Sequence, residues 1–186
     1  ICDAYAEPTH HWVIEKGRPP HKEPERREAC YYYRPPGRST GAAQADEIGT
    51  RIPLVLVNDI RKRLKLWRQA KFQGANAVTL ELLAYWNREE RERKLFFCQR
   101  EAAETVVFLT EARADFRQGL MIPRDEPGEF VRHACKMATG SGKTAVMAML
   151  AAWSILNKVA DRTDKRFSDV VLALCPNVTI RERLHV

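Results

Sequence analysis

Apolar side chains recur every three or four positions in four parts of the chain, which is the period of an amphipathic helix. The predicted helices occupy the second half of 53–67, then 80–93, 95–114 and 144–159. Thr79 stands where the N-cap of the second helix is expected, and Gly74 separates that helix from the first. The fourth helix is apolar nearly all round, so we expect it to be buried on most sides.

Shorter apolar runs predict β-strands on both sides of the last helix. Residues 132–136 lead into a glycine-rich loop, and 169–176 form a continuous apolar run of the kind that a buried parallel strand has. Strand, helix and strand in this order predict a right-handed βαβ unit, and therefore an α/β fold with a parallel sheet. Residues 29–33, with three tyrosines, predict one further short strand near the N-terminus.

These elements divide the chain into three regions. A region rich in proline, glycine and aromatic residues covers 1–50, a basic helical region covers 51–94, and the βαβ unit belongs to 95–186. The 186 residues are enough for one domain with a core of its own. Because no run of about eighteen apolar residues occurs, a membrane-spanning helix is not expected.

The chain is basic, with 31 Lys and Arg against 24 Asp and Glu and a net charge of +7. This balance either suits a polyanionic partner, nucleic acid first, or belongs simply to a basic domain. The cations of the first predicted helix form either a phosphate-contact face or a solvated exterior. Five scattered cysteines without a C-x-x-C pair make a zinc site unexpected and favour a reducing, cytoplasmic setting.

The strongest chemical signal is the loop 137–144, Met-Ala-Thr-Gly-Ser-Gly-Lys-Thr, between the predicted strand and helix. Gly140 and Gly142 let the backbone curl and direct its N–H groups into one concavity, at the positive end of the helix. Lys143 supplies a charge for the β- and γ-phosphates of a nucleotide, and Thr144 supplies a hydroxyl for Mg²⁺. The P-loop pattern is met except at its first position, where this chain has methionine instead of glycine.

The loop resembles motif I of superfamily-two (DEAD/DEAH-box) helicases, and the wider chain resembles the R subunit of type III restriction enzymes. The stretches that share the resemblance are 7–12, 52–67, 82–87, 95–111 and 169–184. It implies a RecA-like P-loop NTPase sheet, incomplete here, in an N-terminal fragment of an ATP-dependent DNA helicase or translocase from a restriction endonuclease. It also implies ATP and Mg²⁺ as cofactors, with DNA and a modification (methyltransferase) subunit as partners.

The same resemblance assigns residues to the site. The nucleotide-binding set is Gln99, Arg100, Thr139, Gly140, Ser141, Gly142, Lys143 and Thr144, of which Lys143 and Thr144 are also the catalytic pair. Gln99 is assigned to the adenine ring, because a side-chain amide both donates and accepts, and Arg100 is its neighbour in that pocket. The DNA-backbone set, in a segment that resembles motif Ia, is Asn177, Thr179 and Arg181.

Hydrolysis of ATP also needs an acidic residue that holds Mg²⁺, which such helicases carry in a later DEAD- or DEAH-like box. No such box occurs in 1–186, so this piece alone is expected to be inactive. Two other functions stay open. One is a P-loop DNA-dependent ATPase that moves along DNA without unwinding or cutting it. The other is a nucleic-acid-binding module that does not hydrolyse ATP.

Overall fold

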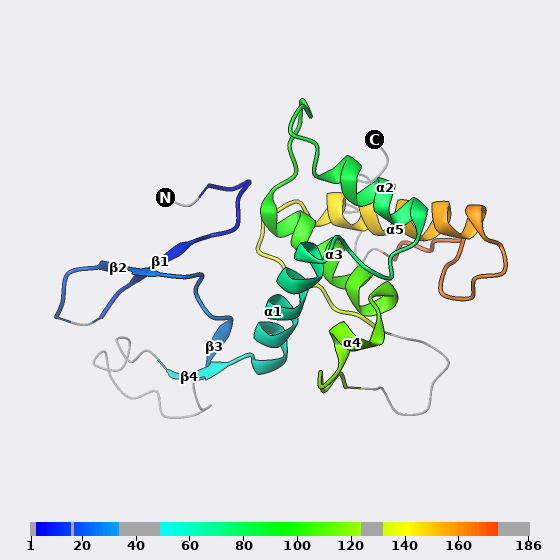
Figure 1. Cartoon of the computed structure of the whole chain (residues 1–186). Helices are drawn as coiled ribbons and strands as arrows, with labels where there is room; N and C mark the ends of the chain where they lie inside the picture. The colour runs from blue at the N-terminus through cyan, green and yellow to red at the C-terminus, as the bar shows by residue number, and fades with distance from the viewer. Residues whose placement is uncertain (1–2, 16, 34–48, 124–131, 175–186) are drawn as a thin grey trace.

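The computed structural model describes residues 3–15, 17–33, 49–123 and 132–174, and Figure 1 shows their arrangement. The strands are β1 (His10–Val13), β2 (His21–Pro24), β3 (Cys30–Tyr33) and β4 (Thr50–Pro53). The helices are α1 (Val55–Gln69), α2 (Ala77–Trp86), α3 (Phe97–Glu111), α4 (Ala114–Arg117) and α5 (Lys143–Ala160). The long helices gather in one group, and the strands lie to one side of it (Figure 1).

The strands form two separate antiparallel pairs, β1 with β2 and β3 with β4. No parallel sheet occurs among the described residues, so the predicted α/β fold with a parallel P-loop (RecA-like) sheet is wrong. Neither 132–136 nor the described part of 169–176 forms a strand, and Val170, Leu172 and Leu174 are exposed. An apolar run fits a buried strand only where neighbouring strands pair with both of its edges, and the part of the chain that the structure describes supplies no such pairing.

The strand predicted near the N-terminus is confirmed as β3, and its start is fastened to α1. The side-chain amide of Asn58 accepts from the backbone N–H of Ala29 at 2.8 Å and donates to its carbonyl at 3.0 Å. The N–H of Leu54 donates to the same carbonyl at 2.8 Å. Because Asn58 is buried, these bonds satisfy polar groups that would otherwise be costly, and they join β3 to the first turns of α1.

The core lies where α1, α2, α3 and α5 meet. Leu64 and Trp67 of α1 are fully buried, and the ring of Trp67 packs edge-on against Phe108 of α3 at 5.5 Å between centroids. Leu83 contributes from α2 and Trp153 from α5 to the same cluster. The cluster therefore takes side chains from both sides of the predicted division at residue 94.

The predicted helices agree with α1, α3 and α5, whereas α2 differs at both ends. It begins at Ala77, because the side chain of Asn76 caps it by accepting from the N–H of Thr79 at 2.9 Å. Thr79 is therefore inside the first turn and fully buried, so the prediction that it is the N-cap is wrong. At the other end, the side chain of Asn87 donates to the carbonyl of Leu83 at 2.8 Å, and the helix ends at Trp86.

The last helix, α5, is buried on one face rather than on most sides. Val146, Met149 and Trp153 point into the core, while Met147 and Leu156 are about half exposed. The expectation of burial on most sides is thus wrong for the described part of the molecule, since α2 and α3 cover only one face. No helix among the described residues combines the length and apolar character that crossing a membrane requires.

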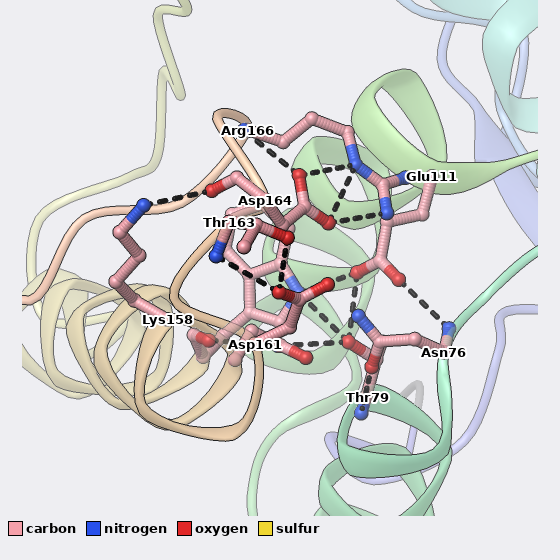
Figure 2. Close-up of polar contacts among 10 residues, drawn as sticks. Asn76, Thr79, Glu111, Lys158, Asp161, Thr163, Asp164 and Arg166 are labelled. Atoms are coloured by element: carbon pink, nitrogen blue, oxygen red, sulfur yellow. Dashed lines mark hydrogen bonds and ion pairs between the residues drawn. The ribbon is translucent and has the colours of Figure 1, made fainter.

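A buried carboxylate, Glu111 at the end of α3, joins three helices (Figure 2). Its Oε1 accepts from the Thr79 hydroxyl and from the Trp153 indole N–H, both at 2.7 Å, and its Oε2 accepts from the backbone N–H of Asn76 at 2.9 Å. The side-chain amide of Asn157 donates to the Thr79 hydroxyl at 2.9 Å. These bonds fix the start of α2 and the middle of α5 on the end of α3.

Replacing Glu111 with alanine is expected to lower the free energy of unfolding by about 3 kcal/mol, because buried donors lose their acceptor. Urea unfolding followed by the fluorescence of the buried tryptophans measures the change. Glu92→Ala, at an exposed carboxylate, is the matched control and should leave the unfolding midpoint unchanged. Equal midpoints for the two variants would contradict a central role for Glu111.

Candidate functional site

The glycine-rich loop forms a tight turn that leads directly into α5. Gly140 and Gly142 both have left-handed backbones, with φ of 78° and 79°. The carbonyl of Ala138 accepts from the Ser141 hydroxyl at 2.7 Å and from the Lys143 ammonium at 2.8 Å. The loop is therefore closed on itself, with its one lysine folded back onto a backbone oxygen.

The start of α5 presents backbone donors beside this turn. Gly142 is the N-cap residue, and its carbonyl accepts from the N–H groups of Ala145 and Val146. The N–H groups of Lys143 and Thr144, in the first turn, have no acceptor within the helix itself. Both side chains are exposed. A cation, a hydroxyl and backbone N–H groups at the positive end of an 18-residue helix together suit an anion.

Gln99, in the first turn of α3, binds the backbone of the loop. Its Oε1 accepts from the backbone N–H of Phe96 at 2.9 Å, and its Nε2 donates to the carbonyl of Ser141 at 3.1 Å. A Cβ atom placed on Gly142 would lie 1.9 Å from Nε2 of Gln99. The left-handed backbone therefore favours glycine there, and a larger residue would also have to displace the Gln99 amide.

The structure brings Gln99 to the loop but not Arg100. The Arg100 guanidinium donates to Oδ1 of Asn87 at 2.5 Å and to the carbonyl of Tyr5, and none of its bonds reaches residues 137–144. Successive helix residues point about 100° apart, which explains why neighbours in sequence serve different surfaces. The adenine role assigned to Gln99 stays a prediction. Its amide has one N–H and one lone pair beyond the bonds made in the protein.

Met137, where the P-loop pattern expects glycine, is half-buried at an apolar cavity of about 280 Å³. Val146 and Leu150 of α5 also line this cavity, as does the stem of Lys143. Cys135 is on the same wall, and partial burial raises the pKa of its thiol. The methionine therefore fills apolar space beside the loop, a role that the sequence pattern alone did not indicate.

The structure describes one of the four remaining predicted site residues. Thr139 is exposed in the loop. Asn177, Thr179 and Arg181 lie outside the described residues. The loop therefore gathers the predicted phosphate-binding residues, with Gln99 behind them, and the predicted DNA contacts stay predictions.

Thr144 is the one residue that the sequence predicts as a Mg²⁺ ligand. The described residues include no cluster of three or more His, Cys, Asp or Glu side chains suited to a metal. Asp161 and Asp164 follow α5 at its other end, about 27 Å along the helix from the loop. Bonds from Thr163 hold the pKa of Asp161 below its ordinary value, and Arg166 does the same for Asp164. These carboxylates therefore organise the turn after α5 rather than the loop.

A scan against protein-family models, a search of curated proteins and a search of solved structures each find no match to this chain. The resemblance to type III restriction subunits consequently rests on the motifs of the sequence, and above all on 137–144. The geometry of this loop is independent of that resemblance.

Alanine is expected to be worse tolerated at Gly142 than at Gly140. Both positions have left-handed backbones, so each substitution should lose about 1 kcal/mol of stability. Only at Gly142 would the added Cβ collide with the Gln99 amide and displace it from the Ser141 carbonyl, which should add about 1 kcal/mol; nothing lies within 4 Å of a Cβ at Gly140. Thermal or urea unfolding of the two variants measures the difference.

The cause is tested in the background Gln99→Ala, where the collision is absent. There the two alanine substitutions should cost the same within about 0.5 kcal/mol. If Gly142→Ala remains the more damaging change without Gln99, the contact between Gln99 and the loop is not the reason.

Proposed function

We propose that the loop 137–144 binds the phosphates of Mg²⁺-ATP, and that the chain is part of an ATP-dependent DNA helicase or translocase similar to the R subunit of type III restriction enzymes. The observation that carries the proposal is the turn itself. Two left-handed glycines, Gly140 and Gly142, bring the Lys143 ammonium and the start of α5 to one place. Phosphate is the ligand whose charge and acceptor oxygens match this set of donors.

In this proposal the chain binds and orients the nucleotide. Lys143 exchanges its bond to the Ala138 carbonyl for the β- and γ-phosphates, so the loop opens as the ligand enters. The Thr144 hydroxyl is the ligand that the chain offers to Mg²⁺, and bound Mg²⁺ neutralises the phosphate charge. The bond from Gln99 to Ser141 fixes the loop so that its donors need little rearrangement.

The wider function follows from the resemblance. Gln99 would read the adenine edge with its remaining donor and acceptor. Asn177, Thr179 and Arg181 would contact the DNA backbone, and a methyltransferase subunit would complete the restriction system. A reducing, cytoplasmic location fits Cys30, Cys98 and Cys135, which are free thiols. A translocase that neither unwinds nor cuts DNA would use the same loop, and strand separation measured on the whole protein distinguishes the two.

Lys143→Ala is expected to weaken binding of Mg²⁺-ATP at least tenfold, because the loop loses its one full positive charge. Isothermal titration calorimetry on the full chain measures the affinity. Binding of AMP should change less than twofold, since AMP lacks the β- and γ-phosphates that Lys143 is proposed to contact. Lys165→Ala removes an exposed lysine outside the loop and serves as the matched control.

Unchanged ATP affinity in Lys143→Ala would overturn the proposed phosphate site. An equal loss in Lys165→Ala would show that net charge, and not the loop, attracts the nucleotide. If Lys143→Ala weakened AMP and ATP binding in the same proportion, Lys143 would not act on the β- and γ-phosphates.

A further inference from the structure

A second concave surface, remote in sequence from the loop, lies between α1 and the N-terminal segments 7–9 and 25–28. It is a cleft of about 660 Å³, and we name it the basic cleft. Its cationic side chains are Arg26, Arg27, Arg61, Lys62 and Lys65. Segment 7–9 directly precedes β1, and segment 25–28 connects β2 with β3 (Figure 1).

Ion pairs within the chain leave part of this positive charge uncompensated. Glu28 of the cleft pairs with Arg51 at 2.9 Å, and Arg26 pairs with Glu101 at 2.5 Å. By contrast, Arg61 and Lys65 have no hydrogen bond or ion pair with any described residue. Lys62 has only a 4.0 Å contact with Asp59. Four cations of the cleft remain besides Arg26, and they outnumber its two remaining carboxylates, those of Glu7 and Glu25.

Arg61 is a partly desolvated cation that lies near the charge of Arg26. Its guanidinium is half-buried, and burial together with the nearby charge of Arg26 lowers its pKa, although it stays charged at neutral pH. The carboxylates of Glu101 and Glu7 attract this charge, but neither forms a direct ion pair with Arg61, so its guanidinium lacks both full hydration and a bound counter-ion. An anion entering the cleft would supply what the chain does not.

The cations of α1 are presented by a rigid element. Arg61 and Lys65 are four residues apart, so they lie on the same side of the helix, about 6 Å apart along its axis. Leu64 and Trp67, on the adjoining face of the helix, are fully buried in the core. The side chains that line the cleft therefore project from a helix whose position the core already fixes.

We propose that the basic cleft binds the phosphodiester backbone of a nucleic-acid strand. Exposed aromatic residues follow its two N-terminal segments along the chain and offer stacking surfaces for bases. Trp12 is about half exposed, and its carbonyl accepts a bond from Arg27 of the cleft. Tyr31, also about half exposed, follows the segment that Asn58 of the cleft holds. A flat membrane surface would not fit the concave shape, and the cleft does not depend on nucleotide binding at the loop.

The test is fluorescence anisotropy of a labelled single-stranded oligodeoxynucleotide with the full chain at several salt concentrations. The triple variant Arg61→Gln, Lys62→Gln, Lys65→Gln should bind at least tenfold more weakly near 0.1 M salt. The slope of log affinity against log salt should shrink by about 2, since each lost phosphate contact accounts for about 0.7. Circular dichroism establishes that the variant is folded.

A matched control removes the same charge elsewhere: Arg93→Gln, Lys94→Gln, Arg162→Gln, at exposed residues that do not line the cleft. It should stay within twofold of the unaltered protein. Equal losses in both triple variants would reduce the effect to net charge and overturn the proposal. The proposal would also be overturned if the cleft variant lost binding to phosphatidylserine vesicles but kept its affinity for the oligonucleotide.

Should the triple variant fail to fold, Lys62→Gln with Lys65→Gln changes only exposed side chains of α1. It should still lose at least threefold in affinity and about 1.4 in salt slope. An unchanged affinity in this folded double variant would overturn the proposal.

Discussion

The structure depends on the buried carboxylate of Glu111. Removing a carboxylate from water is costly unless donors surround it, and here three donors do so, one from the start of α2, one from its first turn and one from the middle of α5. Its charge also helps to raise the pKa of Arg166, after the stronger effect of Asp164. Since each donor must stay in place for Glu111 to remain buried, the three helices cannot slide past one another independently.

That constraint reaches the loop, because α3 is tied to the α5 segment at two points. Gln99 bonds Ser141, and Glu111 bonds Trp153. The two residues of α3 are twelve positions apart, and so are their two partners. The segments therefore run in roughly the same direction with matched spacing. Two contacts therefore fix the position of α5 relative to α3. One is the Glu111 network at the end of α3, and the other is the bond from Gln99 to the glycine loop at its start.

The sequence predicted what depends on local pattern and missed what depends on distant partners. The period of apolar residues located α1, α3 and α5, and the glycines located the loop before α5. The parallel sheet was wrong because an apolar run such as 169–176 does not specify which strand would pair with it. Thr79 was taken for a cap, although its hydroxyl serves Glu111, 32 residues away. Met137 looked like a departure from a motif, whereas its surroundings explain it as filling apolar space.

The first turn of α3 explains why the N-terminal region and the loop belong to one arrangement. Phe97 donates its N–H to the carbonyl of Ala4 at 2.8 Å, and the guanidinium groups of Arg26 and Arg68 lie over its ring, 5.2 and 5.5 Å from the centroid. Two residues on, Gln99 reaches the loop. Two further on, Glu101 pairs with Arg26 of the basic cleft. Three residues in the first five positions of α3 thus contact the two candidate binding surfaces, so neither surface can shift far without straining the other.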